Sequence, residues 1–222
     1  MKLTKCFLFI LSLFLLSCVK TADLLPIKPE KNISQIITWG DSLTFGLGGG
    51  GVTYPNVLQQ LSSIKVINEG VSGNTSKQIA ARMVDSTRYY SSPVIIWAGK
   101  NNFRDTTQVK NDIALMVSKL THKDYLILSI INGEYTLEQK GNSDYVIINK
   151  LNAYLSATYG SHYIDVRSYL VSHYDPTKPA DVTDFNNDIP PASLRSDSLH
   201  LNAAGYTLVA KKVYESINIL KQ

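Results

Sequence analysis

Short apolar runs alternate with longer amphipathic stretches along most of this chain, and this alternation restricts the fold more than any other feature. The short runs lie at residues 36–39, 64–68, 93–97, 125–131 and 162–166. Strands that are apolar on both faces are typical of a parallel sheet that is covered on both sides. The stretches between and after them have helical spacing of apolar residues and predict helices at residues 54–61, 76–89, 109–120, 144–159 and 203–220.

This order of elements predicts an α/β fold. Strands that alternate with helices through right-handed crossovers form a three-layer α/β/α sandwich, here around a central parallel sheet of about five strands. Hydrophobic residues make up 44% of the 222 residues and charged residues 18%, a balance that excludes a disordered or fibrous chain. The net charge of +4 gives no indication of a nucleic-acid partner. Residues 172–196 are rich in Pro, Asp and Asn and predict a long irregular loop with a functional role.

The first 32 residues have a different pattern. Lys2 and Lys5 form a short basic start before an apolar run at residues 6–16. This layout is typical of a secretory signal, and the run is too short to span a bilayer comfortably. The run ends in Leu-Leu-Ser followed by Cys18, which resembles the lipobox of bacterial lipoproteins. The resemblance implies a signal peptide at residues 1–17, lipidation of Cys18, a tether at residues 18–32 and attachment to the membrane of the bacterial cell envelope. A cleaved signal with an incidental cysteine is the alternative.

Polar motifs stand where ligands bind in sheets of this kind, at the carboxyl ends of the strands. Gly40-Asp41-Ser42-Leu43 follows the first run, Ser72-Gly73 follows the second, and Gly99-Lys100-Asn101-Asn102 follows the third. Asp197-Ser198-Leu199-His200 precedes the last helix. Each motif alone is common. Together and in this order, they predict one site at the edge of the sheet.

The residue types in these motifs are those that catalysis by a serine hydroxyl requires. Such a hydroxyl needs a base, which His200 would supply, and Asp197 would orient and stabilise the imidazole. The backbone N–H groups of Ser42 and Gly73 and the side-chain amide of Asn101 would bind the oxyanion. The alternatives are that Ser42 only caps the following helix and that Asn101 is an ordinary loop residue. Likewise, His200 could be a histidine at a helix start with a solvent partner, and Asp197 a turn residue.

The four motifs resemble those of the SGNH/GDSL hydrolase superfamily, and the resemblance covers residues 33–222 as one hydrolase domain. It implies a flavodoxin-like sandwich and hydrolysis of an ester or thioester through a serine acyl-enzyme. Where the superfamily has an aspartate after the asparagine of its third motif, this chain has Asn102. The departure raises the question of how that loop is anchored.

The other histidines and a run of glycines predict no second site. His122, His162 and His173 have no partner pattern and are expected to pack or to lie on the surface. Without a metal-ligand spacing, the sequence predicts no metal and no cofactor. Residues 48–51 are all glycine but lack the Gly-Lys-Ser/Thr of a phosphate-binding loop. They predict a mobile segment at the rim of the substrate cleft.

The leading prediction is a serine esterase that removes small acyl groups from a carbohydrate or another small ester at the cell envelope. It depends on the predicted surface location, on the polar character of residues 172–196 and on the lack of an extended apolar lid. A lysophospholipase, a thioesterase or a glycan acyltransferase would use the same residues. A non-catalytic glycan-binding lipoprotein is the alternative outside the enzymes. The acyl chain, the alcohol, the membrane leaflet and the oligomeric state stay open.

Overall fold

The computed structural model describes residues 33–221, so the predicted signal peptide, Cys18 and the tether lie outside the described residues. Within that range one sheet contains β1 (Gln35–Gly40), β2 (Lys65–Gly70), β3 (Val94–Trp97), β4 (Tyr125–Leu128) and β5 (Tyr163–Ile164). The strand order is β2-β1-β3-β4-β5, and all neighbouring strands are parallel. This is the flavodoxin-like order. The predicted parallel sheet of about five strands is confirmed.

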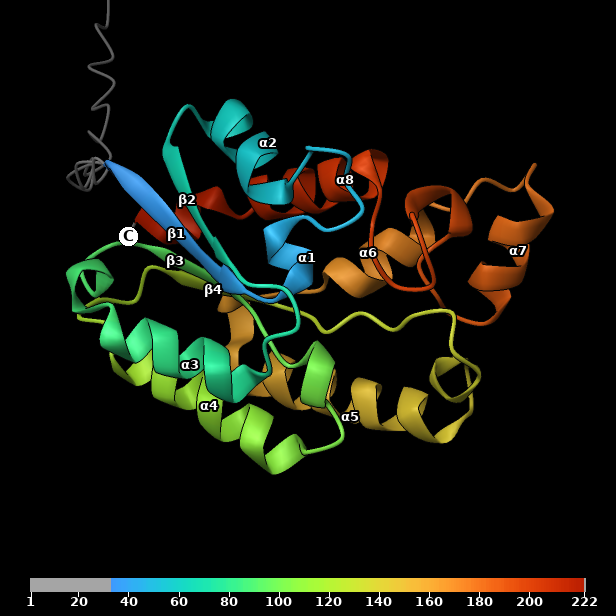
Figure 1. Ribbon diagram of the computed structural model, residues 1–222, viewed down its shortest axis with the longest axis horizontal. Coiled ribbons are helices and arrows are strands. Elements are labelled where there is room, and N and C mark those ends of the chain that lie inside the picture. Colours follow the sequence, from blue (N-terminus) through green and yellow to red (C-terminus); the bar gives the residue numbers. More distant parts are fainter. Residues whose placement is uncertain (1–32, 222) are drawn as a thin grey trace, which may run out of the picture.

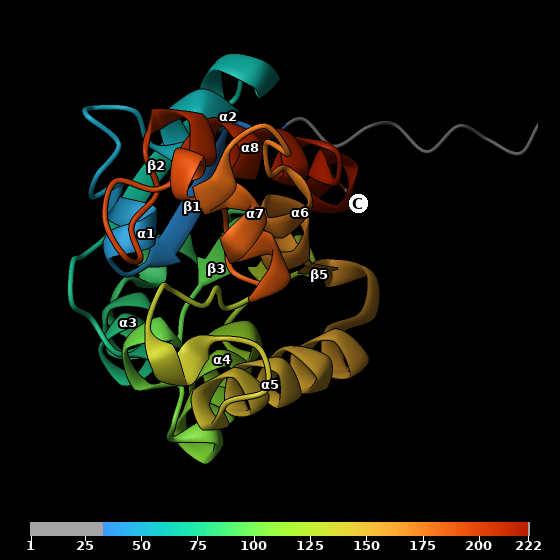
Figure 2. The same ribbon diagram turned by 90° about the vertical axis from the view of Figure 1, so that its right-hand side faces the viewer.

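Helices cover both faces of the sheet, so the sandwich has three layers (Figures 1 and 2). One face carries α2 (Tyr54–Ser62), α6 (Val166–Ser172) and α8 (Ala203–Tyr214), and the other carries α3 (Ser76–Asp85), α4 (Thr106–Ser118) and α5 (Ser143–Tyr159). Successive side chains of a strand point to opposite faces. Ile36 therefore packs in the core under the first set of helices and Ile37 in the core under the second. The predicted three-layer arrangement is confirmed.

Two apolar runs extend beyond the strands that they form. Residues 129–131 stay buried after β4 ends at Leu128, and β5 has only two residues. The side chain of Asn152 on α5 explains the early end of the ladder. Its Oδ1 accepts the N–H of Ile130 at 2.9 Å, and its Nδ2 donates to the Ile130 carbonyl at 2.8 Å. The Asn152 side chain thus makes the hydrogen bonds with the Ile130 backbone that a neighbouring strand would otherwise make.

The prediction of an irregular loop at residues 172–196 is wrong in part. This stretch contains α7 (Pro179–Asn186) and a 3₁₀ turn (Ala192–Leu194). The buried carboxylate of Asp181 orders it, because it accepts the N–H of Asp175 at 3.0 Å and the N–H of Ser193 at 2.8 Å. A polar composition that suggested a loop instead supplies internal hydrogen bonds.

Two predicted helices end early. The helix predicted at residues 76–89 ends at Asp85, followed by a 3₁₀ turn (Thr87–Tyr89), and α8 ends at Tyr214 before a 3₁₀ segment (Ile217–Lys221). Among residues 33–221, no helix has both the length and the apolar character needed to cross a membrane.

Candidate active site

The turn after β1 places Ser42 at the edge of the sheet. Ser42 is the first residue of α1 (Ser42–Phe45), and the carboxylate of Asp41 caps this helix by accepting the N–H of Leu43 at 2.9 Å. The cap of α1 is therefore Asp41 and not Ser42. The turn is tight, because a Cβ added at Gly40 would lie 2.0 Å from the Thr44 hydroxyl oxygen. The helix start thus presents the Ser42 hydroxyl at the carboxyl end of the sheet.

The structure brings Ser42, His200 and Asp197 together. Nε2 of His200 lies 3.0 Å from Oγ of Ser42, and Nδ1 of His200 lies 2.7 Å from Oδ2 of Asp197. The Ser42 hydroxyl comes from the first helix, and the two other side chains come from the loop that precedes α8. Hydrogen bonds thus link the carboxylate, the imidazole and the hydroxyl in one line.

The Asp197 carboxylate is held as an anion. Burial raises its pKa, but the N–H groups of His200 and Leu199, each 2.7 Å from Oδ1, and the imidazole outweigh that effect. The pKa of Asp197 therefore lies below its ordinary value. An acceptor that stays ionised keeps the imidazole oriented, with Nδ1–H toward Asp197 and Nε2 toward Ser42.

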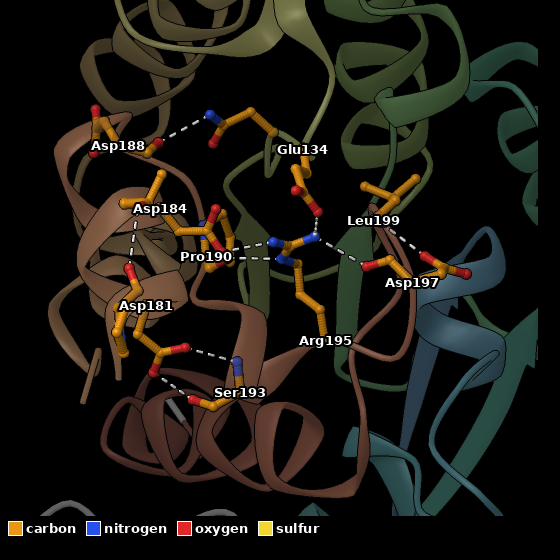
Figure 3. A network of polar contacts seen from close by, with 12 residues as sticks. Glu134, Asp181, Asp184, Asp188, Pro190, Ser193, Arg195, Asp197 and Leu199 are labelled. Carbon is orange, nitrogen blue, oxygen red and sulfur yellow. Dashed lines mark hydrogen bonds and ion pairs between the residues drawn. The ribbon is translucent and has the colours of Figure 1, made fainter. Parts of the chain in front are cut away.

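A buried arginine fixes the loop that carries Asp197 (Figure 3). Nη1 of Arg195 donates to the Asp197 carbonyl and to the Glu134 carboxylate, both at 3.0 Å. Nη2 donates to the Asp184 carboxylate at 2.6 Å, and Nε donates to the Pro190 carbonyl at 2.8 Å. No local motif indicates this network, because Glu134 and Arg195 are 61 residues apart.

Of the predicted oxyanion donors, Asn101 contacts the turn that carries Ser42. Nδ2 of Asn101 donates to the Asn74 carbonyl at 2.9 Å and lies 3.5 Å from Oδ2 of Asp41, so Asn101 connects the turn with the loop that carries Gly73. A Cβ added at Gly73 would meet no atom within 4 Å. The backbone there has φ of +79°, so conformation rather than a protein contact requires glycine.

Arg82 on α3 also connects the turn that carries Ser42 with the loop that carries Gly73. Its guanidinium donates to the Gly40 carbonyl at 3.0 Å, to the Glu69 carbonyl at 2.8 Å and to Oδ1 of Asn74 at 2.8 Å. The ends of β1 and β2 and the Gly73 loop therefore share one rigid donor. Sequence reasoning missed Arg82 because an arginine on the polar side of a predicted helix has no distinguishing pattern.

The structure answers the question raised by Asn102. Its Oδ1 accepts the N–H of Ser76 at 2.9 Å, and its Nδ2 donates to the Ser76 hydroxyl, also at 2.9 Å. The Ser76 hydroxyl then donates to the buried carboxylate of Asp112 at 2.5 Å. The position needs one acceptor and one donor, which an amide supplies and a carboxylate does not.

Burial changes the electrostatics behind the site. It raises the pKa of Asp41 to about 6, against the opposing effect of the Leu43 N–H. The same effect lowers the pKa of the buried Lys100, although the attraction of Glu138 opposes it. Lys100 pairs with Glu138 at 2.5 Å. The ammonium group of Lys100 is therefore buried and paired within the protein.

The segment of four glycines packs against the His200 loop. A Cβ added at Gly48 would lie 2.0 Å from the Ser196 hydroxyl oxygen and 2.9 Å from the Leu201 carbonyl. Just before it, the Leu47 carbonyl accepts the hydroxyl of Tyr206 on α8 at 2.7 Å. Successive hydrogen-bonded turns give the segment a defined conformation. That the segment is mobile stays a prediction from the sequence.

The three other histidines make local structural contacts, as expected. His122 bonds to the Ser92 carbonyl, His162 stacks on Tyr125, and His173 bonds to the Tyr169 carbonyl. In the part of the chain that the structure describes, no group of three or more His, Cys, Asp or Glu side chains is arranged to hold a metal ion.

Comparisons with known proteins agree with this geometry. A model of the GDSL-like lipase/acylhydrolase family matches residues 38–208, which include all four motifs. The fold is similar to that of a lipase/acylhydrolase from Enterococcus faecalis, with a TM-score of 0.62, 16% identity and coverage of 84% of this chain and 96% of that one. A member of the lipolytic protein G-D-S-L family from Veillonella parvula gives a TM-score of 0.61, 20% identity and coverage of 82% and 96%.

One curated relative is similar in sequence. The tail spike protein of Salmonella phage epsilon15 is 31% identical over 111 residues, which are 48% of this chain. The chain spans only 10% of the length of that protein.

Proposed function

This chain belongs to the GDSL-like lipase/acylhydrolase family, and on that premise we propose that it is a serine esterase with Ser42 as its nucleophile. The single observation that supports this most directly is the hydrogen-bonded line from Asp197 through His200 to Ser42, with contacts of 2.7 and 3.0 Å. A serine hydroxyl reacts at neutral pH only when a base accepts its proton during attack. His200 is placed to do so.

In the proposed reaction, Oγ of Ser42 attacks the ester carbonyl carbon while Nε2 of His200 takes the hydroxyl proton. The carbonyl oxygen becomes an oxyanion. When the bond to the alcohol oxygen breaks, the imidazolium returns the proton to that oxygen, and an acyl-Ser42 ester remains. Water then attacks the acyl-enzyme with His200 again as the base, and a carboxylic acid is released. Asp197 stabilises the imidazolium in both halves of the reaction.

Three donors would bind the oxyanion. The N–H of Ser42, at the first position of α1, has no acceptor within its own helix. The N–H of Gly73 and the side-chain amide of Asn101 are the other two. Nδ2 of Asn101 donates to the Asn74 carbonyl at 2.9 Å, which fixes the group, and its contact with Oδ2 of Asp41 is longer, at 3.5 Å. In the proposed reaction, the N–H of the longer contact turns to the substrate oxygen. Loss of one such donor typically costs about 3–4 kcal/mol of transition-state stabilisation.

Two measurements on the full chain test this proposal. A fluorophosphonate probe should label Ser42, and the Ser42→Ala and His200→Ala variants should each lose more than about a thousandfold in hydrolysis of p-nitrophenyl acetate. The Asp197→Ala variant should lose less of the hydrolysis rate than these two variants. Ser118→Ala on the surface of α4 and His173→Ala are the matched controls and should retain the rate. A folded wild-type protein that is not labelled would favour a glycan-binding protein without turnover.

The substrate is proposed at two levels. Hydrolysis of a small acyl ester follows from the machinery, and removal of acetyl groups from a carbohydrate is the finer proposal from the sequence. A lysophospholipase or thioesterase would instead hydrolyse long acyl chains, and an acyltransferase would produce acylated sugar in proportion to the sugar added. A screen of acetylated sugars, lysophospholipids and acyl thioesters separates these activities.

We propose that the enzyme is attached to the cell envelope, because Cys18 follows the apolar run with lipobox spacing. Cells grown with radioactive palmitate should incorporate label into the wild-type chain. The Cys18→Ser variant should carry none. Equal labelling of the two proteins would contradict lipidation at this residue.

A further inference from the structure

A cavity of about 370 Å³ opens between the segments that follow β3 and β4. Its lining includes Phe103, Arg104, Tyr135, Leu137, Glu138 and Asp144. Nothing in the proposed reaction so far uses this space. Its size lies within the range of small-molecule sites.

The cavity adjoins both halves of the active site. Phe103 follows Asn101, the proposed oxyanion donor, by two residues. On the other side, the N–H of Glu134 donates to the Ser198 carbonyl at 2.7 Å, within the loop that carries Asp197 and His200. A Cβ at Gly133 would lie 2.6 Å from that carbonyl and 2.8 Å from the Tyr135 ring. The ring of Tyr135 therefore packs close to this loop and forms a wall of the cavity.

The charged groups around the cavity already have partners within the protein. Arg104 donates from Nε and Nη2 to the Asp144 carboxylate at 3.0 and 2.5 Å. Oε2 of Glu138 accepts the Lys100 ammonium at 2.5 Å and the Gly133 N–H at 2.7 Å. These pairs reduce the capacity of the walls to recognise a charged or hydroxyl-rich ligand.

Apart from Thr136, the remaining lining consists of the side chains of Phe103, Tyr135 and Leu137. Phe103 is buried, whereas Tyr135 and Leu137 are 46% and 50% exposed. Two large apolar side chains that are exposed to water gain stability when a ligand covers them.

We propose that this cavity binds a hydrocarbon segment of the ester substrate, several bonds away from the scissile carbonyl. The segment comes from the acyl chain or from the alcohol. An acetyl group has no atoms with which to reach the cavity, so only a longer ester fills it. This inference rests on the proposed esterase function and deepens it, because it shifts the preferred substrate from an acetylated sugar toward an ester with an apolar part.

Two ester series measured with the full chain test the proposal and identify the source of the segment. One series varies the acyl chain from acetyl to octanoyl with p-nitrophenol as the constant alcohol. The other consists of acetates of ethanol, butanol and hexanol, which share the acetyl group. In one series kcat/KM should rise about fourfold for each methylene that enters the cavity. No rise in either series would overturn the inference.

A pair of leucine variants locates the effect. Leu137→Asp places a charge in the wall and should lower the ratio of kcat/KM for the longest to the shortest ester of the rising series by at least about tenfold. Leu115→Asp changes a leucine of similar exposure on α4, outside the cavity, and should leave the ratio unchanged. Equal effects of the two variants, or no change of the ratio in Leu137→Asp, would overturn the assignment of the cavity. Tyr135→Ser repeats the test at a second wall residue.

The outcomes also separate the two proposals. If no ester is hydrolysed and Ser42 is not labelled, the esterase function and this inference both fail. If acetate esters are hydrolysed in a Ser42-dependent way and both series are flat, the function stands and the inference alone fails.

Discussion

Replacement of Asn102 by aspartate should destabilise the fold even though it introduces the residue that the superfamily pattern has at this position. The amide of Asn102 donates to the Ser76 hydroxyl at 2.9 Å, and the proton of that hydroxyl goes to Asp112 at 2.5 Å. A carboxylate at position 102 removes one donor. Two carboxylates would then compete for the single proton of the Ser76 hydroxyl.

The expected loss in the free energy of unfolding is about 2 kcal/mol. The lost hydrogen bond is worth about 1 kcal/mol. Repulsion between two partly buried carboxylates adds about 1–2 kcal/mol after screening by neighbouring dipoles. A negative charge at the start of α3 offsets about 0.5 kcal/mol of this through the helix dipole. For a domain of this size, the melting temperature should fall by roughly 4–8 °C.

Urea unfolding followed by circular dichroism measures this difference directly. Because the introduced carboxylate lies near Asp112, it should take up a proton more readily when folded than when unfolded. The deficit should therefore shrink as the pH is lowered from 8 toward 4. Asn56→Asp is the control, since it makes the same charge change at an exposed residue of the first turn of α2. An Asn102→Asp variant as stable as the wild type at pH 8 would refute the reasoning.

Three further predictions concern the groups that support the site. Arg195→Met leaves the buried Asp184 carboxylate without its partner and should lower the free energy of unfolding by about 3–5 kcal/mol. When Arg195→Met is combined with Asp184→Asn, part of that loss should be recovered. No recovery in the double variant would contradict the pairing. Arg82→Lys cannot bond to three separated acceptors and should lower kcat about tenfold with a smaller change in KM; an unchanged kcat would show that the Gly73 loop does not depend on Arg82. Burial raises the pKa of Asp41 to about 6. The folded state therefore binds more protons than the unfolded state between about pH 4 and pH 6, and wild-type stability falls as the pH rises through that window. Asp41→Asn keeps the helix cap and removes the charge. The free energy of unfolding of this variant, relative to the wild type, should therefore increase by a few kcal/mol from pH 4 to pH 7 and then level off. If denaturant titrations show a difference that does not vary with pH, the raised pKa of Asp41 is contradicted.

The sequence was sufficient for the sheet and for the residues that meet at its edge. The apolar runs located all five strands of the described sheet. The reason is clearest for β1, β3 and β4, because a strand that is buried on both faces has a composition that few other elements share. The distances from His200 to Ser42 and Asp197 agree with the predicted contacts. These residues could be predicted because each stands in a short local motif beside a strand or a helix.

The supporting residues could not be predicted, because their partners are distant in the sequence. Arg82 bonds to the Gly40 carbonyl 42 residues away, and Arg195 bonds to Glu134 from 61 residues away. Every residue has a backbone carbonyl, so the sequence does not indicate which carbonyl accepts a side-chain hydrogen bond.

For Asp181, the sequence instead led to a wrong prediction of local structure. Its loop-like neighbourhood predicted irregular chain, whereas its carboxylate ties that stretch together through Ser193.

The hydrogen bond from Tyr206 to the Leu47 carbonyl has a consequence for the time at which the protein first becomes active. It connects the final α-helix with the segment just after Ser42. His200 stands 158 positions after Ser42, so the chain must be synthesised through His200 before the two residues can meet. A nascent chain that has already formed most of its sheet still has no base for its hydroxyl. The ribosome must therefore finish nearly the whole domain before the imidazole of His200 can reach the Ser42 hydroxyl.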